Sequence, residues 1–174
     1  MNIIKAKENQ YDSVRCFYHS LIEEMQKSPY DIGWKKDIYP SPEFLRESIA
    51  KEELYIGMEN GKIIAAMVLN HQCNDGYQKF QWQTEAEKNE ITVIHALGIH
   101  PAYSGKGHAK SMVKKVFEIA ADRHQKAIRL DVLSGNIPAE KLYTRMGFQY
   151  MDTLQMYYED TGWTDYELYE YVLN

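Results

Sequence analysis

The chain has 174 residues, a length typical of one domain with a substantial apolar core. Its formal net charge of −5 argues against a nucleic-acid-binding protein, and its two cysteines, Cys16 and Cys73, are too few for a disulfide framework. No apolar run reaches the length of a membrane span and no secretory signal is visible, so we expect one cytoplasmic domain over residues 1–174.

The first third of the chain predicts a short strand and two amphipathic helices. Residues 2–6 suit a strand, and Asn9 is the predicted N-cap of the first helix. Ser41 and Pro42 suit the N-cap and the first turn of a second helix. The first helix carries an apolar stripe at helical spacing, formed by Val14, Phe17, Tyr18, Leu21, Ile22 and Met25.

A β-hairpin is predicted next, over residues 54–59 and 62–70. The two runs are joined by Asn60 and Gly61, and Asn-Gly between extended runs is a strong hairpin signal. Residues 71–89 are polar and hold no clear pattern. Part of this stretch is a candidate extension of the sheet, because the aromatic residues Tyr77, Phe80 and Trp82 alternate imperfectly.

The centre of the chain predicts a strand, a glycine turn and a helix. Residues 91–99 are mostly apolar and β-branched, as in a strand buried on both faces, and Pro101 should end it. The turn over residues 104–109 precedes an apolar stripe at helical spacing that begins at Met112. A helix that starts at such a turn presents free backbone N–H groups and the positive end of its dipole, which suits a phosphate group.

The last third closes a β–α–β crossover and adds a final pair of strands. Residues 127–132 form the next predicted strand, which should run parallel to the central strand through a right-handed connection. A short helix is expected after Ser134, with Pro138 in its first turn and Gly147 at its end. Residues 148–157 and 164–173 are rich in tyrosine and predict two more strands.

Two sequence motifs give the glycine turn a family context. The turn is neither GxxxxGK[ST] nor GxGxxG, but it resembles the pyrophosphate-binding motif Q/R-x-x-G-x-G/A of the GCN5-related N-acetyltransferases (GNAT). Ser104, Gly107 and Ala109 occupy its defined positions, with Ser104 in place of the usual Gln or Arg. A second match follows downstream to the family signature N-x-x-A-x-x-L-Y-x-x-x-G-F, carried by Asn136, Ala139, Leu142, Tyr143, Gly147 and Phe148.

This resemblance implies an α/β fold and acetyl-CoA as the acyl donor, in a small single-domain member of bacterial type. The expected sheet is mixed and mostly antiparallel, with six to seven strands, helices on both faces and a splayed central strand pair. Backbone N–H groups of the turn would bind the diphosphate, and pantetheine would lie in the gap between the splayed strands. The residues assigned to acetyl-CoA are Leu97, Gly98, Ile99, Ser104, Gly105, Lys106, Gly107, His108, Ala109 and Asn136.

The resemblance also implies catalytic roles. The backbone N–H of Leu97 would polarise the thioester carbonyl, and Tyr143 would protonate the departing thiolate. Glu90 and His95 are the two candidates for the base that deprotonates the amine; the alternatives are a solvated strand end, a core histidine, and deprotonation by solvent. No metal is expected, because no paired ligand motif occurs in the sequence.

The sequence therefore predicts an N-acetyltransferase that moves an acetyl group to a primary amine of a small molecule, by direct attack in a ternary complex. Trp34 and Tyr39 are candidate lining residues of the acceptor cleft, or aromatic residues at the edge of the core. A catalytically silent acyl-CoA sensor and a nucleotide-phosphate-binding protein stay open as alternatives. Neither nucleic acid nor a membrane is expected as a partner, and a homodimer would fit the family.

Overall fold

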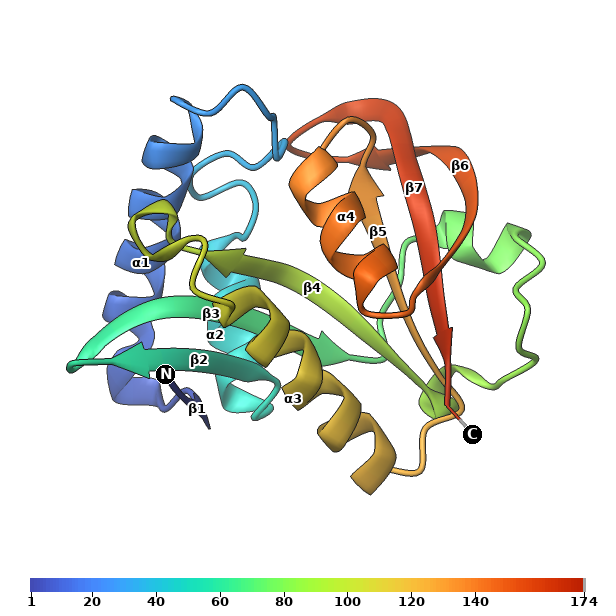
Figure 1. Ribbon diagram of the computed structural model, residues 1–174, viewed down its shortest axis with the longest axis horizontal. Helices are drawn as coiled ribbons and strands as arrows, with labels where there is room; N and C mark the ends of the chain where they lie inside the picture. The colour runs from blue at the N-terminus through green and yellow to red at the C-terminus, as the bar shows by residue number, and fades with distance from the viewer. Residues whose placement is uncertain (174) are drawn as a thin grey trace.

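A seven-stranded sheet with the order β1-β2-β3-β4-β5-β7-β6 runs through the computed structural model, which describes residues 1–173 (Figure 1). Neighbouring strands are antiparallel except β4 and β5, which are parallel. The strands are β1 (Asn2–Lys5), β2 (Leu54–Glu59), β3 (Lys62–Asn70), β4 (Ile91–Ile99), β5 (Ala127–Leu133), β6 (Gln149–Tyr158) and β7 (Gly162–Val172). The predicted mixed, mostly antiparallel sheet is confirmed.

Four α-helices cover the two faces of this sheet: α1 (Tyr11–Met25), α2 (Pro42–Ala50), α3 (His108–Asp122) and α4 (Ile137–Arg145). Helices α3 and α4 cover one face, and α1 and α2 cover the other. Strand β3 contacts both pairs, because its successive side chains point to opposite faces. Met67 packs in the same buried cluster as α3 and α4, whereas Ala66 and Val68 pack with α1 and α2. Among residues 1–173, none of the helices combines the length and hydrophobicity that crossing a membrane requires.

Local sequence signals fix most of these elements. The Ser41 hydroxyl accepts a hydrogen bond of 3.1 Å from the Phe44 N–H and caps α2, as predicted. Asn60 and Gly61 have φ of 50° and 75°, so the hairpin turn needs its Asn-Gly pair. The prediction that Asn9 caps α1 is wrong, because residues 8–10 form a 3₁₀ turn and α1 begins only at Tyr11.

The segment between β3 and β4 adds no strand, so the predicted sheet extension is wrong. It holds two 3₁₀ turns, η2 (Asp75–Lys79) and η3 (Lys88–Glu90). Its aromatic residues pack together instead of alternating: the Trp82 ring lies 5.1 Å from the rings of Tyr77 and Phe80. A buried ion pair of 2.9 Å between Arg129 Nε and Glu170 Oε1 anchors the segment, since the Arg129 guanidinium lies 4.3 Å from the Trp82 ring.

The two parallel strands touch at only one end. Strands β4 and β5 pair through Ile91, Thr92 and Val93, opposite Ala127, Ile128 and Arg129. Beyond these three residue pairs the strands diverge, as Figure 1 shows. The predicted splayed central pair is therefore confirmed, and it opens a gap in the middle of the sheet.

Candidate active site

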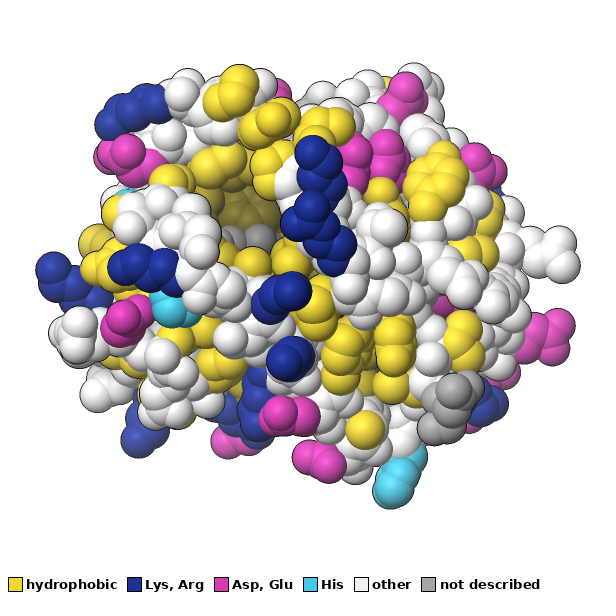
Figure 2. Space-filling view, viewed as in Figure 1, with side chains coloured by type: hydrophobic (Ala, Val, Ile, Leu, Met, Phe, Trp, Pro, Cys, Tyr) yellow, Lys and Arg dark blue, Asp and Glu magenta, His cyan; other side chains and the backbone are white. Residues whose placement is uncertain are grey.

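A cleft of about 1070 Å³ opens where β4 and β5 separate. Residues 94–99 of β4 and residues 130–133 of β5 line its two sides. Figure 2 shows a hollow with a hydrophobic floor and with Lys and Arg side chains at its rim. The cleft therefore offers a protected apolar channel with charged groups at its edge, which is typical of a small-molecule site.

The glycine turn forms one end of the cleft. Ser104, Gly105, Gly107, His108 and Ala109 line it, whereas Lys106 does not. Gly105 and Gly107 have φ of 77° and 80°, and no atom lies within 4 Å of the position that a Cβ would take at either residue. Gly107 directly precedes α3, so its turn leaves an open concavity beside the first N–H groups of the helix.

Three cationic side chains also line the cleft. Lys110 on α3 and Lys141 and Arg145 on α4 line the cleft. Within the described residues none of the three makes an ion pair. Together with the helix N-terminus they favour a ligand that carries several negative charges.

A β-bulge distorts β4 in the wall of the cleft. Val68 pairs with His95 and Ala66 pairs with Gly98, so Ala96 and Leu97 lie opposite the single residue between them on β3. Ala96 has φ of 49°, and its carbonyl oxygen accepts a hydrogen bond of 2.8 Å from the Tyr18 hydroxyl of α1. A bulge interrupts the regular ladder, which makes backbone groups at Leu97 available for contacts across the gap.

Tyr143 on α4 has a buried ring, and its hydroxyl makes no hydrogen bond with the residues that the structure describes. The residue is 6% exposed and lines the cleft, and among residues 1–173 nothing hydrogen-bonds its hydroxyl. Burial raises the pKa of the Tyr143 phenol, and the negative charge of Asp131 raises it further. The phenol therefore stays protonated at neutral pH and can donate a hydrogen bond or a proton into the cleft.

The two candidate bases lie in different places. Glu90 is not a lining residue; it lies before β4, where its carboxylate contacts Lys126 Nζ at 2.8 Å and the Glu87 N–H at 2.9 Å. His95 does line the cleft, and its Nε2 lies 2.9 Å from Asn70 Oδ1 and 3.0 Å from the Gln72 carbonyl oxygen.

The environment of His95 keeps its ring neutral. Both partners of Nε2 are oxygen acceptors, so Nε2 carries the proton and Nδ1 is the free acceptor. Burial lowers the pKa of His95 to about 4. Its imidazole is therefore a weak base at neutral pH.

Asn136 lies at the N-cap position of α4 and lines the cleft, but its side chain makes no capping hydrogen bond. The amide is therefore available to a ligand. Within residues 1–173 no group of three or more His, Cys, Asp and Glu side chains has the geometry to hold a metal ion.

Two carboxylates in the cleft were missed by the sequence predictions. Asp131 on β5 accepts hydrogen bonds from the hydroxyls of Tyr77 at 2.7 Å and Tyr158 at 2.8 Å. Asp160, in the turn between β6 and β7, is 5% exposed and also lines the cleft. A signal for Asp131 was present, because it is a carboxylate within an otherwise apolar stretch of its strand.

The segment between α1 and α2 forms another wall of the cleft. Its residues Trp34 and Tyr39 line the cleft, as predicted. Gly33 has φ of 74°, and a Cβ there would approach Thr161 Cγ2 to 2.7 Å, so the segment packs closely against the turn between β6 and β7. The segment thus spans the cleft from the α1 side to the β6 side.

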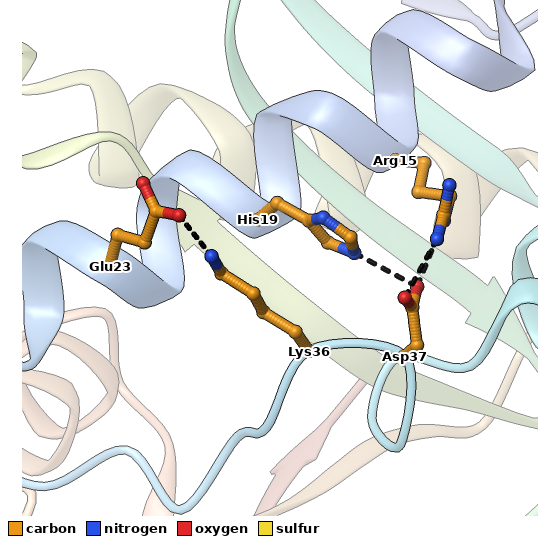
Figure 3. A network of polar contacts seen from close by, with 5 residues as sticks. All are labelled: Arg15, His19, Glu23, Lys36 and Asp37. Atoms are coloured by element: carbon orange, nitrogen blue, oxygen red, sulfur yellow. Dashed lines mark hydrogen bonds and ion pairs between the residues drawn. The ribbon is translucent and has the colours of Figure 1, made fainter.

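A network of polar contacts fixes this segment to α1 (Figure 3). Asp37 accepts from Arg15 Nη2 at 2.7 Å and lies 2.8 Å from His19 Nε2, while Lys36 pairs with Glu23. The Arg15 hydrogen bond is the main reason that the pKa of Asp37 lies well below its usual range. The position of Trp34 and Tyr39 therefore depends on contacts that α1 provides on its exposed face.

Comparisons with known proteins bear on these features. Residues 17–148 match the family model described as Acetyltransferase (GNAT) family. An uncharacterized N-acetyltransferase of Methanocaldococcus jannaschii is 29% identical over 90 residues, which cover 52% of this chain and 36% of that protein. A spermine/spermidine N(1)-acetyltransferase of Bacillus subtilis is 35% identical over 75 residues, which cover 42% of this chain and 49% of that protein. The match thus spans less than half the length of either relative.

A solved structure from Salmonella typhimurium, described with its cofactor acetyl-CoA, has a TM-score of 0.72 at 14% identity. The superposition covers 100% of this chain and 94% of that chain. At this identity the likeness shows the fold alone.

Proposed function

Because the chain belongs to the acetyltransferase (GNAT) family, we propose that it transfers an acetyl group from acetyl-CoA to a primary amine of a small molecule. The amine attacks directly in a ternary complex, within one domain that spans residues 1–174. The observation that carries this proposal is the continuity of one cleft, which joins the glycine turn, the gap between β4 and β5, and the hydroxyl of Tyr143. The acetyltransferase activities for which the relatives are named and the acetyl-CoA of the Salmonella structure agree with it.

The glycine turn would hold the diphosphate of acetyl-CoA. The backbone N–H groups of residues 105–109 are fixed donors and need no ordering of side chains. The empty space at Gly105 and Gly107 lets phosphate oxygens approach the backbone closely; Ser104 and His108 line the same cleft, whereas Lys106 does not. Lys110, Lys141 and Arg145 supply positive charge for the remaining phosphate, and the Asn136 amide is available for a further contact.

The bulged part of β4 would position the reacting thioester. Pantetheine lies along Leu97, Gly98 and Ile99, where β5 has moved away from β4. The Leu97 N–H then donates to the thioester carbonyl, and its hydrogen bond strengthens as negative charge develops on that oxygen. One donor of this kind typically lowers the barrier by about 3–4 kcal/mol.

Tyr143 is the proposed general acid. Its protonated hydroxyl, which no group among residues 1–173 hydrogen-bonds, donates a proton to the thiolate of coenzyme A as the carbon–sulfur bond breaks. Glu90 has no part in this scheme, because its carboxylate lies outside the cleft and is held by Lys126. His95 faces the cleft, but its lowered pKa leaves it a poor proton acceptor at neutral pH.

Calorimetry and a thiol-release assay test the proposal together. The protein should bind acetyl-CoA more tightly than ATP or NAD, and it should release thiol only when an amine is added. Binding without thiol release across a broad amine panel would identify a silent sensor instead. Preference for ATP or NAD would identify a nucleotide-binding protein, and a burst of thiol without amine would contradict direct attack.

A further inference from the structure

The cleft contains two carboxylates that have no cationic partner in the described part of the chain. Asp131 and Asp160 both line it, and neither forms an ion pair with any of residues 1–173. Asp160 is 5% exposed, and the nearby Lys35 is exposed and beyond ion-pair distance. A buried carboxylate such as that of Asp160 is rarely left without a counter-charge, so a cation in this part of the cleft would complete the site.

Of the two carboxylate oxygens of Asp131, only one accepts hydrogen bonds from the described residues. Both phenol hydrogen bonds reach Oδ2, and no donor among the described residues reaches Oδ1. The carboxylate alternates along β5 with Leu130 and Val132, which pack with α3 and α4, so it points to the other face of the sheet. The glycine turn and Asp131 thus approach the gap from opposite faces.

An independent observation also points to a ligand between these groups. The Tyr143 side chain is buried and lines the same cleft, its hydroxyl has no hydrogen-bond partner among residues 1–173, and the charge of Asp131 adds to the upward shift of its pKa. The proton donor and the open carboxylate oxygen therefore border one space.

The rest of the acceptor side suits an organic cation. The rings of Trp34 and Tyr39 line the cleft with centroids 5.9 Å apart, and Tyr166 lines it from β7. Aromatic faces attract ammonium groups, and they also shield a cation from water.

We propose that Asp131 binds the ammonium group of the acceptor and takes its proton through Oδ1, while Asp160 adds a second negative charge that selects small cationic alkylamines. This inference rests on the proposed acetyl transfer. It names the acceptor class and the proton acceptor, neither of which the family membership supplies.

The proton balance of the step is as follows. One ammonium proton passes to Asp131, and the freed nitrogen lone pair forms the new bond to the thioester carbon. A second proton leaves the nitrogen as the carbon–sulfur bond breaks, and it replaces the proton that Tyr143 gives to the thiolate. The third proton remains on the amide, and Asp131 returns its proton to solvent.

The surroundings of both carboxylates agree with these roles. Burial raises the pKa of Asp131, while the hydroxyls of Tyr77 and Tyr158 oppose this shift and the charge of Asp160 adds to it. Burial likewise raises the pKa of Asp160; the backbone N–H groups of Asp160 and Thr161 and the charge of Lys35 oppose the shift, and Asp31 adds to it. A carboxylate with a raised pKa accepts a proton from an ammonium group more readily than an exposed one does.

The test compares Asp131→Asn and Asp160→Asn with Asp165→Asn, a control that removes one carboxylate from the exposed face of β7. Each variant is assayed with an alkylamine, which is charged at pH 7, and with an arylamine, which is not. For the alkylamine, kcat/KM should fall about 10²–10⁴-fold in Asp131→Asn, the usual size of general base catalysis. Asp160→Asn should mainly raise KM for the alkylamine, and the arylamine should be affected far less in both.

Acetyl-CoA affinity and the thermal unfolding midpoint are measured on every variant. The amide oxygen that Asp131→Asn introduces can still accept from both tyrosine hydroxyls, and Asp160→Asn tests the same site if the first variant fails to fold. Alkylamine kinetics in Asp131→Asn and Asp160→Asn that match the control would overturn the inference while leaving acetyl transfer intact. Absence of thiol release by the unmodified protein with every amine would instead overturn the proposed function itself.

Discussion

The hydroxyl of Tyr18 donates a hydrogen bond of 2.8 Å to the carbonyl oxygen of Ala96, 78 residues further along the chain. Ala96 has φ of 49°, a conformation that costs an L-residue about 1 kcal/mol. The hydrogen bond therefore ties the bulge of β4 to α1 and holds Leu97 in place beside the gap. Tyr18 is 1% exposed, so this contact is sealed from water.

Replacing Tyr18 with Phe should destabilise the fold and disturb the bulge. The loss of one buried hydrogen bond lowers the free energy of unfolding by about 0.5–1.5 kcal/mol. Because Leu97 depends on the bulge, kcat should fall as well. Tyr150→Phe is the matched control, since Tyr150 is 53% exposed and its hydroxyl hydrogen-bonds only Thr153 among residues 1–173. Equal unfolding midpoints for the two variants would contradict this role.

Replacing Tyr143 with Phe should slow the chemical step about 10²–10⁴-fold, the usual contribution of a general acid. Calorimetry should show nearly unchanged acetyl-CoA binding, because only one hydroxyl is removed. Tyr171→Phe serves as the control: its ring stacks on Phe117, with centroids 4.5 Å apart, and does not line the cleft. Wild-type turnover in Tyr143→Phe would remove the residue from the mechanism.

Gly107→Ala should separate backbone strain from ligand binding. Gly107 has φ of 80° and Gly61 has φ of 75°, and a Cβ at either position would meet no atom within 4 Å. Gly107→Ala and its control Gly61→Ala should therefore each lower the free energy of unfolding by about 1 kcal/mol. Only Gly107→Ala should also weaken acetyl-CoA binding, by about tenfold or more, because its methyl group enters the proposed diphosphate site. Similar acetyl-CoA affinities in the two variants would exclude a diphosphate beside Gly107.

The free energy of unfolding should depend on pH through His95. The folded pKa of about 4 lies below the ordinary value near 6.5, so only the unfolded chain binds this proton between these pH values. His95 therefore contributes about 3 kcal/mol to the free energy of unfolding above pH 6.5. This contribution is lost as the pH falls toward 4. His95→Gln keeps a hydrogen-bond donor without the titration, so denaturant melts should show a shallower acid decline than wild type. Parallel pH curves would refute this account.

Arg129→Met should be among the most damaging substitutions outside the cleft. It leaves Glu170, whose side chain is 0% exposed, as a buried charge without a cation, which typically costs about 3–5 kcal/mol. It also frees the segment before β4, because the Arg129 guanidinium donates to the Thr84 carbonyl oxygen at 2.7 Å. Lys126→Met breaks an exposed ion pair with Glu90 and should have little effect. Comparable stability losses in urea melts would argue against the buried pair as the anchor.

Periodicity and turn chemistry were sufficient to predict most of the fold. The hairpin at Asn60 and Gly61, the cap at Ser41 and the helix after Gly107 all depend on residues that are close in the sequence. The segment between β3 and β4 could not be predicted in this way. Its conformation depends on Arg129 and Glu170, which lie 41 residues apart and reach it from two other strands.

The residues of the candidate site likewise fall into those that a local motif predicts and those that only the fold brings together. The two motifs predicted residues at the glycine turn and on α4, because a motif is a local pattern. Glu90 was proposed from its position at the start of a strand, but its carboxylate is engaged by Lys126. Asp131 and Asp160 gain their significance only from the three-dimensional fold, which brings them together with Tyr143 around one cleft.

The three residue pairs that join β4 to β5 leave the remainder of those two strands without lateral contacts to each other. A molecule seated in the gap would supply the missing contacts and so act as a substitute strand between the two halves of the sheet. Occupancy and resistance to unfolding would then rise together, since whatever binds the folded chain preferentially stabilises it. The short pairing between β4 and β5 would thus make the stability of the whole protein depend on whether its ligand is bound.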